Sequence, residues 1–75
     1  MTQIISGENG VQVQAHSCII GPSNEGYTLN YSADGINWTE YDEAVPEGEN
    51  LIINGMAWGT YIMLVGNQSD VTINW

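Results

Sequence analysis

Acidic side chains are the residues of this sequence with the most evident capacity for chemistry. Five of its nine acids fall close together, at Glu40, Asp42, Glu43, Glu47 and Glu49. Clustered carboxylates are suitable oxygen ligands for Ca²⁺, but this spacing lacks the alternating acids and fixed glycine of an EF-hand loop. The sequence favours a solvated acidic loop around Pro46, with an acidic patch that binds Lys or Arg of a partner as the alternative.

The only histidine and the only cysteine of the chain, His16 and Cys18, lie two residues apart. On one strand, this spacing would place a cysteine nucleophile and its histidine base on the same face. No third residue is placed to orient the imidazole, and so small a chain has little wall for a catalytic groove. We therefore predict a buried structural Cys18, a surface His16, no catalytic residue and no cofactor or metal.

Aromatic side chains are the third group with a chemical use. Trp58 lies between Ala57 and Gly59 in an expected loop, and exposed Trp with neighbouring Asn is typical of sugar-binding modules. Tyr27, Tyr31 and Trp75 instead share strand faces with aliphatic residues, which favours the core or a subunit contact. A bound glycan is therefore the alternative to a partner protein.

The charge balance disfavours two classes of partner. The chain contains no Lys or Arg and has a net charge of −9 at pH 7. Phosphate backbones and anionic membranes are both bound through cationic side chains, so neither nucleic acid nor membrane is predicted as a partner. An acidic mimic of nucleic acid that occupies a basic protein stays as an alternative. The first residues lack the pattern of a secretory signal, which predicts a cytoplasmic location or export within a larger particle.

Alternation of apolar and polar residues with a period of two predicts the elements that position these side chains. We expect a single domain over 1–75 with about seven short strands, at 2–6, 11–17, 27–32, 36–41, 50–54, 60–66 and 70–75. Nine glycines and many β-branched residues disfavour helices. The pattern indicates an all-β fold, either a sandwich or a small barrel, and we expect a small sandwich of antiparallel strands.

The hairpin around Asp34 has a recognisable sequence. Asp34 can accept backbone hydrogen bonds within the turn, Gly35 can supply a positive φ, and the Trp38 ring is expected against the core. The string Ser32-x-Asp34-Gly35-x-x-Trp38 resembles a hairpin of discoidin-type and immunoglobulin-like β-sandwiches, including many phage virion proteins. By its size, its strand composition and this hairpin, the chain resembles the small immunoglobulin-like auxiliary, or decoration, proteins of tailed-phage capsids.

The resemblance implies an immunoglobulin-like sandwich that acts without catalysis, as a multi-copy accessory subunit on a viral capsid. The expected location is then the virion, with assembly in the host cytoplasm.

Association is also expected from stability, because so short a chain buries only about 60% of its unfolded surface. Two segments, 51–53 and 61–65, are apolar on both faces, as in central strands or strands that face a partner. The expected partner is a capsid protein or a second copy. The candidate contact residues are Leu51, Ile53, Trp58, Tyr61, Met63 and Trp75.

Overall fold

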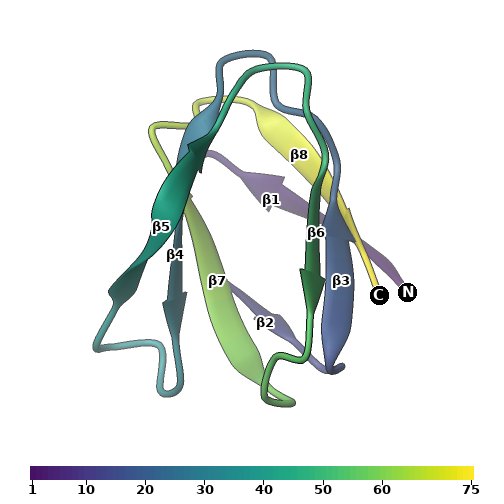
Figure 1. Cartoon of the computed structure of the whole chain (residues 1–75), viewed down its shortest axis with the longest axis vertical. Coiled ribbons are helices and arrows are strands. Elements are labelled where there is room, and N and C mark those ends of the chain that lie inside the picture. Colours follow the sequence, from purple (N-terminus) through teal and green to yellow (C-terminus); the bar gives the residue numbers. More distant parts are fainter.

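The computed structural model describes the backbone of residues 1–75 and every side chain except that of Asp42. The described residues form eight strands in two antiparallel sheets that pack face to face (Figure 1). Sheet A has the order β1 (Thr2–Ser6), β8 (Asp70–Asn74), β3 (Ser17–Ile20) and β6 (Leu51–Asn54). Sheet B has the order β2 (Val11–Val13), β7 (Thr60–Val65), β4 (Tyr27–Ser32) and β5 (Thr39–Val45). The predicted all-β fold is confirmed.

Two of the predicted strands are wrong in their bounds. The segment predicted as one strand over 11–17 is divided, because β2 belongs to sheet B and β3 belongs to sheet A. The apolar alternation changes phase here, from Val11 and Val13 to Cys18 and Ile20, and all four side chains are buried. The strand predicted at 36–41 instead spans Thr39–Val45, since the residues before it form a turn.

The core lies between the two sheets and takes alternate residues from the strands. Its buried apolar side chains, among the described residues, are Ile5, Val11, Val13, Cys18, Ile20, Tyr27, Leu29, Val45, Ile62, Leu64, Val71 and Ile73. Every strand except β6 contributes at least one of them, whereas β6 contributes only half-buried side chains. The core is therefore least complete beside β6.

The buried side chain of Asn67 connects the loops at one end of the sandwich. Ser23 Oγ donates a hydrogen bond to Asn67 Oδ1 over 2.8 Å, and Asn67 Nδ2 donates to the carbonyl oxygens of Gly7 at 3.2 Å and Ser69 at 2.5 Å. Ser69 Oγ in turn donates to a carboxylate oxygen of Glu25 over 2.7 Å, which lowers the pKa of that carboxyl. These bonds join the loops that follow β1, β3 and β7.

The edge of the sandwich formed by β1 and β2 is closed. These strands are the outer strands of their sheets on this side and are joined by residues 7–10. The inward side chains of Ile5 on β1 and Val13 on β2 are 0% exposed. Glu8 also accepts a hydrogen bond from the backbone amide of Gly66 at 2.6 Å, which holds the connection against the β7–β8 turn.

Candidate functional site

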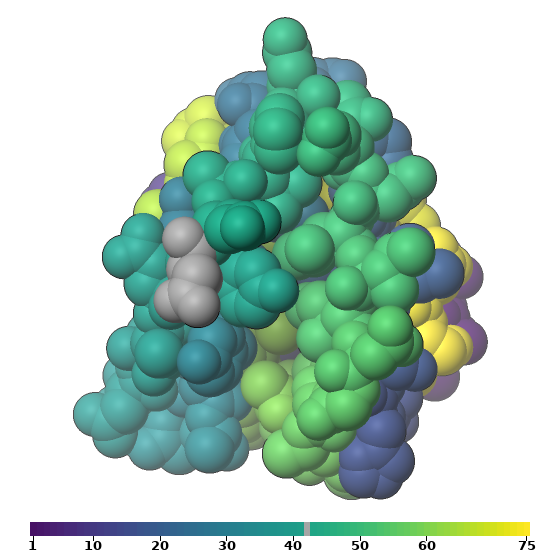
Figure 2. Space-filling model, viewed as in Figure 1, coloured from purple at the N-terminus to yellow at the C-terminus, as the bar shows by residue number. Residues whose placement is uncertain are grey.

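The opposite edge of the sandwich, formed by β5 and β6, is open. Between these two strands lies a groove with a volume of about 540 Å³. Figure 2 shows it as a hollow between the teal surface of the β5 region and the green surface of the β6 region. We call this feature the groove. It is defined chiefly by Leu29, Tyr31, Tyr41, Ile53, Met56 and Ile62.

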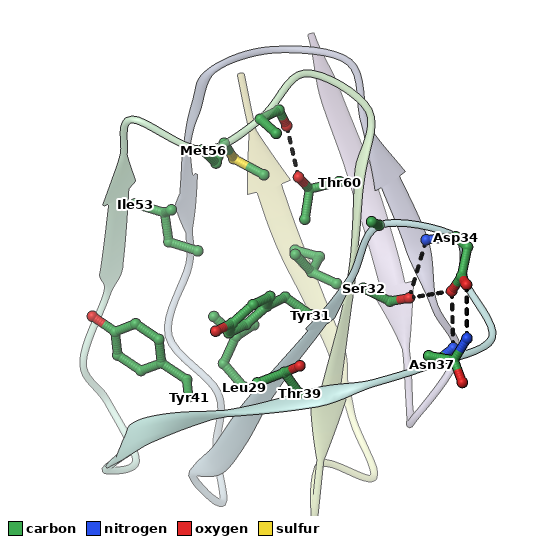
Figure 3. Close-up of a pocket in the computed structure, with 13 residues that line it drawn as sticks. Leu29, Tyr31, Ser32, Asp34, Asn37, Thr39, Tyr41, Ile53, Met56 and Thr60 are labelled. Carbon is green, nitrogen blue, oxygen red and sulfur yellow. Dashed lines mark hydrogen bonds between the residues drawn. The ribbon is translucent and has the colours of Figure 1, made fainter.

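The two sheets line the groove with different side chains. Leu29 and Ile62 of sheet B are almost completely buried. Tyr31 and Tyr41 also come from sheet B, but they remain 40% and 42% exposed. Ile53 of β6 is half-buried on the sheet A side and lines the groove together with these tyrosines (Figure 3). Tyrosine suits this position because its ring can cover apolar surface while its hydroxyl reaches water. The groove is thus an uncovered part of the space between the sheets.

A tightly hydrogen-bonded turn borders one end of the groove. Ser32 Oγ accepts hydrogen bonds from the amides of Asp34 at 3.2 Å and Gly35 at 2.9 Å. Asp34 Oδ1 accepts from the amides of Asn37 at 2.9 Å and Ile36 at 2.8 Å, which hold the pKa of this carboxyl well below its ordinary value. Gly35 has a φ of 78°, so the predicted aspartate–glycine turn is confirmed (Figure 3).

Two aromatic rings near this turn pack against glycines. The ring of Tyr61 lies against Gly35, where a Cβ would be 3.5 Å from it. The ring of Trp38 lies against Gly10, where a Cβ would be 3.2 Å from it. Trp38 is half-buried and does not belong to the core cluster. The expectation that its ring lies against the core is therefore wrong, because Gly10 leaves room for it elsewhere.

The candidate contact residues are spread over several surfaces. Only Ile53 of the six lines the groove. Leu51 and Trp75 are half-buried and pack against the core, whereas Met63 is half-buried on β7. Trp58 is 58% exposed, as expected. A glycan bound at Trp58 stays a prediction.

The two segments that are apolar on both faces have different positions. Tyr61–Val65 lies in β7, which is an inner strand between β2 and β4. Leu51–Ile53 lies in β6, which is an edge strand. The interpretation as a central strand is therefore confirmed for 61–65 and wrong for 51–53.

The acidic residues do not form one loop, as was expected around Pro46. Glu40 and Glu43 lie on β5, whereas Glu47 and Glu49 lie in the connection to β6, and all four are exposed. The side chain of Asp42 is outside the part of the chain that the structure describes. Among the described residues, no three His, Cys, Asp or Glu side chains come together as a metal site.

His16 and Cys18 do not share a strand face. His16 precedes β3 and is exposed, with Nδ1 3.0 Å from the carbonyl oxygen of Met56. Cys18 is 3% exposed, and its burial raises the pKa of the thiol. The predictions of a surface histidine and a buried cysteine are confirmed. The expected common face is wrong because the strand alternation restarts at Ser17.

The outer face of sheet A is a surface that the sequence analysis did not identify. Ile4, Ile19 and Ile52 are 57%, 46% and 62% exposed on it, and Ile19 is the register partner of Ile52. Asp70, at one end of β8, is the only acidic residue in the four strands of this sheet. We call this surface the isoleucine face.

A sequence signal for this face exists in three pairs of adjacent isoleucines. In the pairs Ile4–Ile5, Ile19–Ile20 and Ile52–Ile53, the first residue is exposed and the second is buried or half-buried. Neighbouring residues of a strand point to opposite faces. Each pair therefore places one isoleucine inside and one on the surface.

Comparisons with known proteins do not identify the chain. No family model, no curated protein and no solved structure matches it. Among the described residues there is no apolar helix of membrane-spanning length. The groove and the isoleucine face are the surface features that bear on its function.

Proposed function

We propose that this chain is a non-enzymatic accessory structural protein, bound in many copies to the outside of a viral capsid. The isoleucine face is the observation that carries the proposal. The chain has a net charge of −9, so most of its faces would bury unpaired carboxylates in a contact, which is costly. Sheet A offers a surface without this cost, because its only acid, Asp70, is at one end of β8.

The free energy gained by burying this face suits a protein that binds in many copies to one particle. Burial of a fully exposed isoleucine side chain contributes roughly 1.5–3 kcal/mol. Ile4, Ile19 and Ile52 are each about half exposed, so their burial contributes on the order of 3 kcal/mol together. A contact of that size is weak by itself, and binding in many copies would supplement it with contacts between neighbours. The partner is then an uncharged apolar surface of a capsid protein.

An immunoglobulin-like relationship is part of this proposal. The pairing of β3 with β6 and of β4 with β7 corresponds to strands B with E and C with F of immunoglobulin domains. The last strand departs from that pattern, because β8 lies between β1 and β3 and not beside β7. We therefore propose an immunoglobulin-like sandwich whose last strand lies in the opposite sheet.

The positions of the ionisable groups support a role without catalysis. Cys18 is buried, whereas His16 is exposed. The Asp34 carboxylate already accepts the hydrogen bonds of its own turn. Neither arrangement supplies the nucleophile next to a base that covalent catalysis needs.

Native mass spectrometry of the complex that contains the chain tests this function. We expect many copies on one larger particle. Ile19→Asp should release at least nine tenths of them, because it buries a charge in the contact. Ala44→Asp is the matched control, since Ala44 is exposed on β5 in sheet B, and it should leave the copy number unchanged. A chain that is monomeric in its native source, or equal loss with both variants, would contradict the proposal.

A further inference from the structure

We infer that the groove binds an extended segment of a basic partner protein, which adds to sheet A as a strand alongside β6. Apolar side chains at alternate positions of this segment would enter the groove, and Lys or Arg would flank them. The inference goes beyond the contact at the isoleucine face and stands on different residues. It rests on the lining of the groove, the free edge of β6 and the surrounding charge.

The lining of the groove suits apolar side chains. Its volume of about 540 Å³ lies within the range of ligand sites, roughly 300–1,000 Å³. Tyr31 and Tyr41 are partly exposed and line the groove together with the buried Leu29 and the half-buried Ile53. A side chain inserted here would cover the tyrosine rings and remove apolar surface from water.

The edge of β6 is free to pair with another strand. It pairs with β3 only, in a regular register, and Leu51–Asn54 contains no charge and no proline. Edge strands of soluble proteins are usually protected by charges, prolines or bulges. β5 has such protection, because its register shifts between Thr28 and Asn30 and it carries Glu40 and Glu43. An added strand therefore joins β6 and not β5.

The spacing of β-structure places such a strand above the groove. Neighbouring strands lie about 4.8 Å apart, and packed sheets about 10 Å apart. A strand next to β6 would continue sheet A toward the open side, with its inward side chains directed at Tyr31 and Tyr41. Its outward side chains would lie beside Ile52. Such addition of a peptide strand to a sheet edge gives affinity through the backbone and specificity through alternate side chains.

The charges around the groove indicate which residues flank the apolar part of the bound segment. Glu40 and Glu43 lie on β5, Glu47 and Glu49 precede β6, and Asp34 lies at one end of the groove. No Lys or Arg of the chain offsets them. These carboxylates would repel an acidic segment and attract a segment flanked by Lys or Arg. At physiological salt this effect extends over about 8 Å, the screening length.

A nine-residue peptide, Lys-Lys-Val-Thr-Val-Thr-Val-Lys-Lys, is the probe for this inference. Backbone amide shifts of the full chain should change at Leu51–Asn54 and around Tyr31 and Tyr41 on titration. The same peptide with proline at its central valine cannot form the full ladder of hydrogen bonds, and it should bind at least tenfold more weakly. A peptide with Glu in place of every Lys should not bind.

Two lysine substitutions on neighbouring residues of β6 give a matched pair. Ile53→Lys places a charge in the groove and should weaken the peptide at least tenfold, whereas Ile52→Lys points away and should change affinity less than threefold. Tyr41→Lys repeats the test on β5 should Ile53→Lys fail to fold. Ile19→Asp should leave peptide binding unchanged, so this inference and the capsid contact fail separately.

Three results would overturn the inference. The first is no binding, or equal binding of the proline peptide. The second is a set of amide shifts confined to the acidic residues, with β6 unaffected. The third is a change of the β6 amides on dilution of the chain alone, which would identify a second copy as the occupant.

Discussion

The closed and the open edge of this sandwich use strands of the same kind but fill the space between the sheets differently. At the β1/β2 edge, Ile5 and Val13 are completely buried. At the β5/β6 edge, Tyr31 and Tyr41 remain about two fifths exposed, at 40% and 42%. A short chain can thus complete its core on one side and leave it accessible on the other.

The connections between the strands explain part of this difference. The link between β1 and β2 is held by Asn67, which donates to the carbonyl oxygen of Gly7, and by Glu8, which accepts from the amide of Gly66. The link between β5 and β6 is tied to another loop through a backbone bond, from the amide of Gly48 to the carbonyl oxygen of Ser23 at 2.9 Å. Polar side chains thus hold the link at the closed edge, whereas a backbone bond holds the link at the open edge.

Truncation of one inward-pointing side chain at each edge should show the largest difference between the closed and the open edge. Ile5→Ala should lower the free energy of unfolding by about 3 kcal/mol, because it leaves a cavity in a completely buried position. Tyr41→Ala should lower it by less than about 1 kcal/mol, since this side chain is already partly in water. Urea unfolding followed by tryptophan fluorescence measures both. Equal losses would mean that the two edges are equally packed.

Removal of the Asn67 side chain should have the next largest effect. Asn67→Ala removes the acceptor of the Ser23 hydroxyl and the donor to the carbonyl oxygens of Gly7 and Ser69, which should cost about 2 kcal/mol of unfolding free energy. Gln68→Ala, at the exposed neighbouring position, is the control and should stay within about 0.5 kcal/mol. Faster hydrogen exchange in β1 and β2, with β5 unchanged, would locate the loss at the closed edge. A loss spread evenly over both edges would contradict the assignment.

The pH dependence of the turn beside the groove should be the smallest effect. Hydrogen bonds from the amides of Asn37 and Ile36 lower the pKa of Asp34 from its ordinary 3.8. A lowered folded-state pKa adds stability above the unfolded value, and this stability is lost as the pH falls through the folded value. The stability difference between the wild type and Asp34→Asn should therefore shrink below about pH 4. Unfolding midpoints at about pH 7 and about pH 2 measure it, and a constant difference would exclude this role.

Much of the fold could be predicted from local patterns. Alternation identified the strand at Tyr27–Ser32, and the turn chemistry of Asp34 and Gly35 gave its end. The division of 11–17 into two strands has only a weak signal in the sequence, because the apolar alternation changes phase between Val13 and Cys18 but residues 14–16 include no strong turn residue. Strand periodicity is local, whereas the assignment of a strand to a sheet depends on distant partners.

The surfaces were harder to predict than the core. Ile53 was selected because its strand is apolar on both faces, but its place in the groove depends on β5 and β6 being edges of opposite sheets. Tyr31 follows the alternation of Tyr27 and Leu29 and yet is exposed, because no strand covers it. Sequence pattern shows which way a side chain points, but not whether anything lies above it.

The isoleucine pairs also affect how uniquely sheet A is aligned. A slip of one residue normally exchanges apolar and polar side chains between the two faces and is therefore costly. At Ile52–Ile53 the exchange replaces one isoleucine by another, so this pair does little to select the alignment of β6 with β3, and the selection falls to the strand end, where Asn54 is exposed. The bond from the Met56 amide to the His16 carbonyl oxygen, at 2.9 Å, also favours the observed alignment. The turn that follows β6 therefore helps to fix the alignment of this edge strand with β3.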